Sequence, residues 1–343
     1  MKVGMYYNNS DVRLEEMDVP SVGDGDLLME VKACGICGSD IMEWYRIKRA
    51  PLVLGHEVTG DIVEVGKDVD GFKVGDRITS THHVPCYECR DCLKGYHTTC
   101  ETFHGQNNFA PGGFAQYLRI SGNSVPKGTM ALPEDMSYEQ GSFIEPLGTV
   151  VRGMREIGVT PGETVLVLGS GLIGLLQIKL LRTLGVGVIV AADVQEYRLD
   201  AAVRFGADHV VDAREDLPEF LRQVNGGRLA DKVIVSTGAL AAAKGGLSCV
   251  DKGGTVLFFA VPRPEEQLDI DINAFWRDSK SIKVSYGAAP VDNLQAMDLI
   301  KSGRVEVDDM ITHQLPLDEI GEGFRLTCDG TASLKVIIEP NAR

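Results

Sequence analysis

The stretch VLVLGSGLIGLL, residues 165–176, joins an apolar run to a glycine-rich turn and a second apolar segment. Such a pattern predicts a buried strand that leads into a helix. Gly169, Gly171 and Gly174 follow the strand with the spacing G-x-G-x-x-G. There the first glycine makes a tight turn, the second lets the backbone approach a pyrophosphate, and the third lets helix and strand pack closely. Because the helix start also offers free N–H groups to phosphates, the stretch predicts a dinucleotide site.

Asp193 ends the next predicted strand, VGVIVAAD, 22 positions after Gly171. A carboxylate there accepts hydrogen bonds from an adenosine ribose and repels a 2′-phosphate, so NAD is expected rather than NADP. The alternative is a tight turn before a structural helix, with Asp193 capping the next one. The complete strand–turn–helix–strand context favours the nucleotide site. The other residues expected to contact NAD are Leu172, Ile173, Arg198 and Thr237.

The pattern around this site indicates an α/β protein of two domains. From Glu163 to about residue 286, short apolar strands alternate with helical segments, which predicts a parallel sheet. Residues 1–80 show strand patterns punctuated by glycine, and the tail adds two helices and a last strand. Ser137 is expected to cap one helix over residues 138–158. We therefore predict a β domain at 1–148 plus 287–343, interrupted by a parallel α/β domain at 149–286.

Composition excludes several classes of protein. The 343 residues carry 34 Lys and Arg against 49 Asp and Glu, a formal charge of −15. This charge argues against a nucleic-acid partner, since that affinity comes from clustered cations. No run reaches the roughly 18 apolar residues of a membrane span. The start, MKVGMYYNNS, lacks the apolar core of a signal peptide, so a cytoplasmic protein with no membrane partner is expected.

Six of the eight cysteines lie before residue 101, which indicates metal binding in a chain without a secretion signal. Cys86, Cys89, Cys92 and Cys100 form C-x2-C-x2-C-x7-C in a segment expected to be loop-rich. Four thiolates complete a tetrahedral zinc shell and leave no open position, which predicts a structural zinc. The alternatives are an iron–sulfur cluster, which nothing else in the sequence supports, and four free buried thiols.

A second, mixed set of ligand types is spread over three segments. Cys37 lies in CGICGSD, His56 and Glu57 in LGHEVTG, and Glu145 in FIEPLG. A thiolate, an imidazole and carboxylates suit zinc, and three protein ligands would leave a position for water or substrate. Asp40 could hold the other nitrogen of His56. Neighbouring Cys34 is interpreted as a buried strand residue. Because these segments lie far apart in the sequence, their spacing alone does not show that they form one site.

Together these motifs resemble the zinc-dependent medium-chain dehydrogenases, which include alcohol, polyol and threonine dehydrogenases. GHEVTGDIVEVGKDV fits the family signature G-H-E-x2-G-x5-G-x2-V from Gly55 to Val69. The resemblance covers essentially the whole chain and implies a GroES-like catalytic domain with an inserted Rossmann domain. It also implies two zinc ions per chain, NAD as the cofactor, and a homodimer or homotetramer joined partly through edge strands near IKVSYG, residues 282–287.

The same resemblance assigns roles at the catalytic zinc. Cys37 and His56 would bind the ion, with Glu57 and Glu145 as third ligand or close neighbours. Ser39 would touch the substrate alcohol and pass its proton outward. These roles predict the catalytic residues Cys37, Ser39, His56 and Glu57.

Met42 departs from the family pattern, because polyol and threonine dehydrogenases carry a histidine five residues after the ligand cysteine. The usual proton exit is therefore missing, and Glu43, His82, His83 or water would replace it. We expect oxidation of a secondary alcohol in a polyol or sugar-like substrate. The alternatives are a threonine dehydrogenase or another secondary alcohol dehydrogenase and, from another class, a non-catalytic NAD-sensing protein. The complete metal set argues against a sensor.

Overall fold

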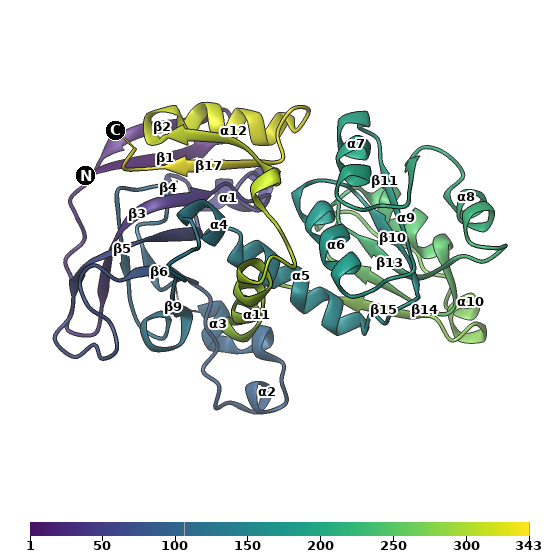
Figure 1. Ribbon diagram of the computed structural model, residues 1–343, viewed down its shortest axis with the longest axis horizontal. Helices are drawn as coiled ribbons and strands as arrows, with labels where there is room; N and C mark the ends of the chain where they lie inside the picture. Colours follow the sequence, from purple (N-terminus) through teal and green to yellow (C-terminus); the bar gives the residue numbers. More distant parts are fainter. Residues whose placement is uncertain (106, 343) are drawn as a thin grey trace. The chain divides into compact units, whose positions relative to one another are not determined.

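The computed structural model describes residues 1–105 and 107–342. The chain forms two compact units, Met1–Gly148 with Gly287–Arg343, and Thr149–Tyr286. We call them unit 1 and unit 2 (Figure 1). Within the part of the chain that the structure describes, no helix has the length and apolar character needed to cross a membrane.

Unit 2 is built on a six-stranded parallel sheet, as the alternating pattern predicts. Its strand order is β12-β11-β10-β13-β14-β15. The strands are β10 Thr164–Leu168, β11 Val188–Asp193, β12 His209–Asp212, β13 Ala230–Val235, β14 Val250–Phe258 and β15 Ser281–Val284. The helices are α6 Leu172–Thr183, α7 Glu196–Arg204, α8 Leu217–Val224, α9 Leu240–Cys249 and α10 Ile272–Arg277. The strand order reverses direction between β10 and β13, which is where this architecture binds dinucleotides.

Unit 1 is predominantly β. An eight-stranded sheet has the path β16-β17-β3-β5-β6-β9, with β8 pairing to β3 and β7, and a separate sheet has the order β2-β1-β4. The N-terminal strands are β1 Lys2–Asn8, β2 Asp11–Glu16, β3 Leu27–Gly35, β4 Leu52–Val53, β5 Glu57–Val65 and β6 Arg77–Ser80. The later strands are β7 Phe109–Ala110, β8 Tyr117–Ile120, β9 Thr129–Ala131, β16 Ile311–Pro316 and β17 Lys335–Glu339.

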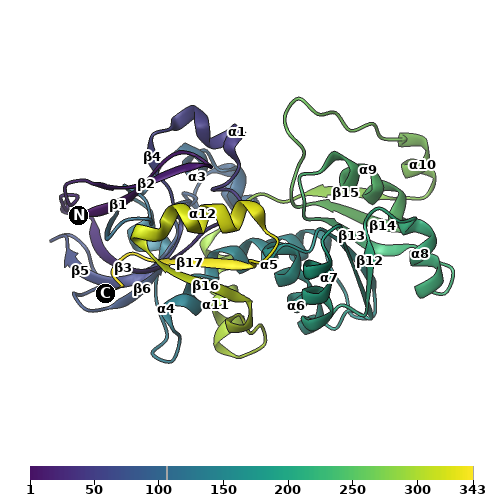
Figure 2. The ribbon, with the colours of Figure 1, turned by 90° about the horizontal axis from the view of Figure 1, so that it is seen from above.

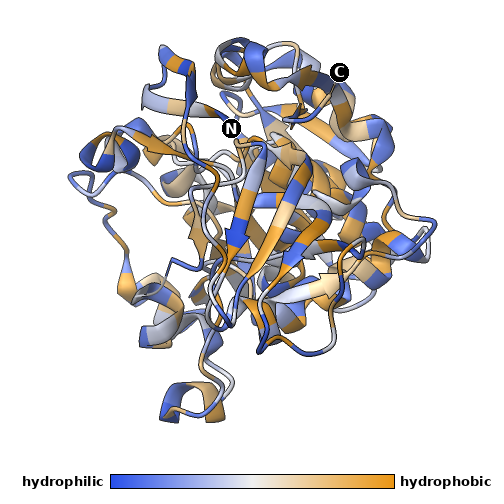
Figure 3. Ribbon diagram, turned by 90° about the vertical axis from the view of Figure 1, so that its left-hand side faces the viewer, coloured by the Kyte–Doolittle hydropathy of each residue, from blue (hydrophilic) through white to orange (hydrophobic). Residues whose placement is uncertain are grey.

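Unit 1 has short α-helices of four or five residues and longer ones of ten to fourteen. They are α1 Glu43–Arg46, α2 Arg90–Leu93, α3 Glu101–Gly105, α4 Tyr138–Gly141, α5 Ile144–Ile157, which continues into unit 2, α11 Pro290–Lys301 and α12 Ile320–Asp329. Helix α12 lies along β17 and β2 (Figure 2). It buries Phe324 against Tyr6, with ring centroids 5.7 Å apart. Hydrophobic residues recur along the strands in Figure 3. In β3, the alternate residues Leu27, Met29 and Val31 point to one face and are fully buried in the core.

The single helix expected after Ser137 is wrong, because the structure has two. Ser137 does cap α4, and a reciprocal pair of hydrogen bonds with Gln140 completes the capping box. The chain then leaves the helix and begins again at Ile144. Pro146 explains the break, because proline has no N–H and is tolerated in the first turn of a helix but not in its interior.

A buried ion pair joins three strands of unit 1. Lys335 begins β17 and its ammonium donates to Oε2 of Glu57, which begins β5. Strand β3 lies between them in the sheet, and its last residue, Gly35, pairs with Glu57. A Cβ atom at Gly35 would lie 2.1 Å from that carboxylate oxygen and 2.4 Å from the ammonium. Glycine is therefore required at position 35 for the ion pair to cross the strand.

Replacing Lys335 should destabilise unit 1 strongly. Both side chains are fully inaccessible, and removal of one partner leaves a buried charge without compensation. Lys335→Met should lower the free energy of unfolding by about 3 kcal/mol or more, measured by urea denaturation. Adding Glu57→Gln should recover part of the loss. The matched control is Lys67→Met, which breaks the exposed pair with Asp24 and should have a far smaller effect. Equal unfolding midpoints for the two lysine variants would contradict the expectation.

Candidate active site

The fold brings Cys37, His56 and Glu57 together. Cys37 follows the end of β3 by two residues, and His56 directly precedes β5. Since Gly35 and Glu57 are paired across these antiparallel strands, the two strand ends meet. One ligand atom from each of the three residues lies within 4.8 Å of the others. A thiolate, an imidazole and a carboxylate at this separation suit a zinc ion.

Asp40 orients the imidazole, as the sequence predicts. It is fully buried, its Oδ1 lies 3.5 Å from Nδ1 of His56, and its Oδ2 accepts a hydrogen bond of 3.0 Å from the Cys37 N–H. Burial opposes ionisation, but His56 and Arg46 still hold the pKa of Asp40 below its usual value. Burial likewise disfavours a charged imidazole, yet Asp40 raises the pKa of His56 well above normal. The ring is thus held with Nδ1 towards Asp40, which leaves Nε2 for a metal.

The carboxylates of this set are only partly satisfied. Oε1 of Glu57 is buried and has no hydrogen-bond partner among the residues that the structure describes, while Oε2 accepts from Lys335. An orphaned buried oxygen beside a thiol and an imidazole fits a cation ligand. Glu145, near the start of α5, is not part of the compact set among the described residues. Burial raises the pKa of Glu145 to about 7, and the charges of His56 and Glu57 also influence it.

The four cysteines of the loop-rich segment also converge. Their sulfur atoms lie within 4.8 Å of one another, and the segment carries the short helix α2, which projects from unit 1 (Figure 1). The N–H groups of Glu88 and Cys89 point at the sulfur of Cys86 and lower its pKa. The N–H of Cys86 in turn points at the sulfur of Cys100. N–H donors favour thiolates, so this cluster resembles a structural zinc site.

Arg46 is a polar residue of this region that sequence reasoning missed. Its Nε donates to the Ser39 carbonyl at 2.9 Å, and its NH2 group donates to Oγ of Ser39 at 3.1 Å. The same NH2 group lies 3.6 Å from Asp40. The only signal in the sequence is a cation a few residues after CGSD, on the four-residue helix α1. Such a short helix has too weak a periodicity to show where its side chains point.

The residues expected to replace the missing histidine lie in two environments: His82 and His83 are near His56, and Glu43 is exposed. The His82 ring lies 5.2 Å from that of His56 and 3.8 Å from that of His83. Burial lowers the pKa of His82 well below normal and that of His83 to about 4. Both rings are therefore neutral at pH 7. Glu43 is exposed and accepts a hydrogen bond from the Asn9 N–H.

In unit 2 the glycine-rich turn has the geometry that a pyrophosphate needs. Gly169 has φ of +95°, and a Cβ atom at Gly174 would lie 2.0 Å from the Gly169 carbonyl oxygen. At Gly171, the N-cap of α6, a Cβ atom would meet nothing within 4 Å, so the backbone is open to a ligand. The next two residues, Leu172 and Ile173, are partly exposed at the helix start.

Asp193 lies at the end of β11 beside this turn. Its carboxylate accepts hydrogen bonds from the Ser170 N–H at 2.7 Å and the Gln195 N–H at 3.0 Å. Arg198 reaches to 3.8 Å from the same carboxylate. Thr237 follows β13 and lies against Gly169, whose Cβ would be 3.1 Å from the threonine side chain. The predicted cofactor residues thus gather where β10, β11 and β13 end.

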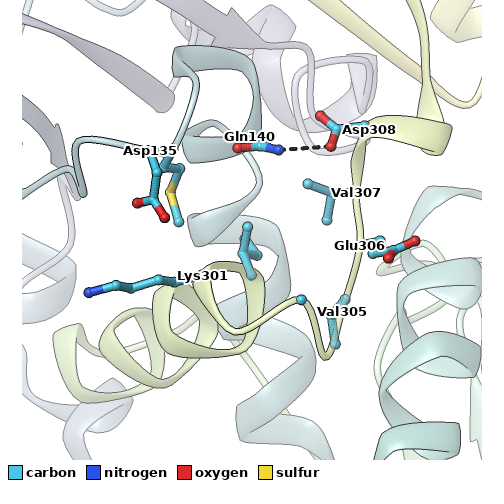
Figure 4. A pocket seen from close by; sticks show the side chains of 10 residues that line it. Asp135, Gln140, Lys301, Val305, Glu306, Val307 and Asp308 are labelled. Carbon is cyan, nitrogen blue, oxygen red and sulfur yellow. Dashed lines mark hydrogen bonds between the residues drawn. The ribbon is translucent and has the colours of Figure 1, made fainter.

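A separate hollow of about 170 Å³ lies in unit 1 beside α4 and α11 (Figure 4). Gln140 donates to Asp308 across it at 2.7 Å, and Lys301 and Glu306 also line it. None of the predicted site residues borders this hollow, and its lining contains neither a thiol nor an imidazole. It therefore does not belong to the candidate active site.

Comparison with known proteins agrees with both units. Residues 23–133 match the alcohol dehydrogenase GroES-like domain and residues 173–302 the zinc-binding dehydrogenase domain. Probable D-xylulose reductase A of Aspergillus clavatus is 33% identical over 92% of this chain and 90% of its own. Sorbitol dehydrogenase of Bacillus subtilis is 29% identical over 99% and 98%. A structure assigned as a zinc-binding dehydrogenase from Sinorhizobium meliloti 1021, bound to NADP, is 27% identical over 99% of both chains with a TM-score of 0.85.

These matches extend over nearly the whole chain, and they agree with a GroES-like β unit and a Rossmann-type parallel sheet. The chain belongs to the zinc-dependent medium-chain dehydrogenase family.

Proposed function

We propose that this protein oxidises a secondary alcohol of a polyol or sugar-like substrate and transfers the hydride to NAD. The observation that carries the proposal is the convergence of Cys37, His56 and Glu57, with Ser39 two residues from the ligand cysteine. Similarity to a sorbitol dehydrogenase and a D-xylulose reductase supports the substrate class.

Each group of the site has a distinct task in this proposal. Cys37, His56 and Glu57, with Glu145 nearby, would hold a zinc ion, which as a Lewis acid lowers the pKa of an alcohol. Asp40 fixes the His56 ring. Ser39 contacts the alcohol oxygen and passes its proton towards water. The four-cysteine cluster would hold a second zinc ion and stiffen its lobe, which has few apolar residues to form a core.

Unit 2 supplies the hydride acceptor. The open backbone at Gly171 and the start of α6 would bind the pyrophosphate, and Asp193 would accept hydrogen bonds from the ribose. Arg198 and Thr237 lie beside these groups and would complete the binding site. Hydride transfer by a nicotinamide needs no further redox group from the protein.

A substrate panel tests the reaction class. Polyols, sugars, threonine and simple alcohols should be assayed by NADH formation with freshly purified protein of measured zinc content. We expect two zinc ions per chain and the highest kcat/KM with a polyol or sugar. Cys37→Ser should remove one zinc ion and lower kcat by at least about 1000-fold, because the Lewis acid is lost.

Cys89→Ser is the matched control, since it removes one thiol of the closed cluster. It should cost one zinc ion and lower the melting temperature rather than abolish turnover of the remaining folded protein. A single zinc ion in the wild type, or full activity in Cys37→Ser, would contradict the assignment of the two sites. A preference for threonine would keep the reaction class and correct the substrate.

Asp193 should control the choice of cofactor. Asp193→Asn keeps one oxygen, which can accept one of the two backbone hydrogen bonds, and removes the negative charge that repels a 2′-phosphate. The ratio of kcat/KM for NADP to that for NAD should rise by about tenfold or more. Asp212→Asn, at the end of the neighbouring strand β12, is the control and should leave the ratio unchanged. A wild-type preference for NADP would overturn this interpretation of the carboxylate.

We further infer that the protein is a homodimer or homotetramer joined through β15. This strand is the edge of the parallel sheet, and its Val284 is 70% exposed, as is Ile272 of α10. Trp276 of α10 is 80% exposed. An edge strand flanked by exposed apolar side chains is a template for pairing with a second chain.

Charge at this edge should oppose association. Val284→Arg should shift the molecular mass measured by light scattering from that of an oligomer towards the monomer of 37.2 kDa, because burial of the arginine is unfavourable. Val74→Arg is the control, since Val74 is also exposed but lies in unit 1. A wild type that is monomeric at micromolar concentration would refute the inference.

A further inference from the structure

Arg46 contacts the hydroxyl that the proposed function places on the substrate alcohol. Its guanidinium reaches back seven residues along the chain and forms two hydrogen bonds to Ser39, one to the carbonyl oxygen and one to Oγ. The side chain is only 16% exposed. Two donors on one planar group fix both the backbone and the side chain of Ser39, which a single flexible contact would not do.

The charge of Arg46 is balanced within the site. Asp40 is fully buried, and its Oδ1 lies 3.6 Å from NH2 of Arg46 and 3.5 Å from Nδ1 of His56. One carboxylate therefore serves the imidazole of the metal set and the guanidinium beside Ser39. Asp40 is thus the nearby anion of Arg46 as well as of the imidazole.

The bond to Oγ determines what the Ser39 hydroxyl can do. A guanidinium has only N–H donors and does not give up a proton in proteins, so Ser39 accepts from Arg46 and cannot donate to it. The hydroxyl hydrogen and the second lone pair remain for other partners. A hydroxyl that accepts from a cation is also a stronger donor, because hydrogen bonds in a chain polarise one another.

We propose that Arg46 is a positioning residue that turns the Ser39 hydroxyl towards the reacting oxygen of the substrate and polarises it. This inference rests on the proposed alcohol oxidation. In that reaction the alcohol loses its O–H proton to water by way of Ser39, and its C–H hydride passes to NAD. Arg46 keeps all its protons and stabilises the negative charge on the oxygen through the intervening hydroxyl. It supplies a fixed charge at a site where Met42 offers no proton carrier.

A binding measurement tests the proposal without turnover. Trifluoroethanol is an acidic alcohol that resists oxidation, and the absorption spectrum of the cobalt-substituted protein with NAD can report its binding. Arg46→Gln should weaken the affinity for trifluoroethanol by about tenfold, since a charged donor to Ser39 is lost. Arg46→Lys should fall between Arg46→Gln and the wild type. Arg49→Gln is the matched control, because Arg49 lies over the same Tyr45 ring, whereas the hydrogen bonds to Ser39 described above come from Arg46.

A double-mutant cycle separates positioning from a general structural effect. If Arg46 acts through the hydroxyl, Arg46→Gln should have no further effect on trifluoroethanol affinity in a Ser39→Ala background. The proposal would be overturned if Arg46→Gln weakened trifluoroethanol binding in the Ser39→Ala background by the same factor as in the wild type. Unchanged affinity in Arg46→Gln, or no binding of trifluoroethanol to the wild type, would also overturn it. If Arg46→Gln fails to take up cobalt, the same cycle is run with Arg46→Lys and judged by the same criteria.

Failure of the proposed function gives a different result. The protein could oxidise no alcohol of the panel and still bind trifluoroethanol with an affinity that depends on Arg46 through Ser39. That result would keep the role of Arg46 and contradict the proposed alcohol oxidation. With an active alcohol from the panel, Arg46→Gln should lower kcat about tenfold and change KM for NAD by less than about twofold. A loss confined to KM for NAD would overturn the positioning role.

Discussion

The buried ion pair between Lys335 and Glu57 is the constraint on which the candidate active site depends. It ties β5, whose first residue, Glu57, belongs to the candidate metal set, to β17, which follows unit 2 in the chain. The pair crosses β3 at Gly35, two residues before Cys37. The strand ends that present the thiol, the imidazole and the carboxylate are thus held by an interaction between the segments that precede and follow unit 2 in the chain.

Much of the fold could be predicted because its signals are local. The apolar run before Gly169 and the carboxylate at Asp193 can each be interpreted from a few neighbouring residues. The parallel sheet follows from the alternation of strands and helices. The break between α4 and α5 could not be seen by periodicity alone, since apolar spacing continues across it. Pro146 was the overlooked signal.

The candidate site was predictable in its ligand types and not in its supporting contacts. Thiol, imidazole and carboxylate side chains are common metal ligands, which made it possible to predict Cys37, His56, Glu57 and the four cysteines from the sequence. Lys335 meets Glu57 across 278 residues of sequence, and Arg46 meets Ser39 from a single helical turn. A lysine in a terminal strand and an arginine among other cations look like surface residues, because only the tertiary structure shows what they touch.

The ion pair also bears on how electrophilic a bound zinc ion would be. Lys335 cancels the charge of Glu57, and His56 contributes a neutral ring when it binds a metal. The thiolate of Cys37 then offsets only one of the two positive charges of the ion. Glu145 can offset the other only when it is ionised, and burial raises its pKa to about 7, so its protonated form is also populated near neutral pH. While Glu145 is protonated, a zinc ion at the ligand set would keep a residual positive charge, which favours ionisation of an alcohol. The charge of Arg46 would act in the same direction through Ser39.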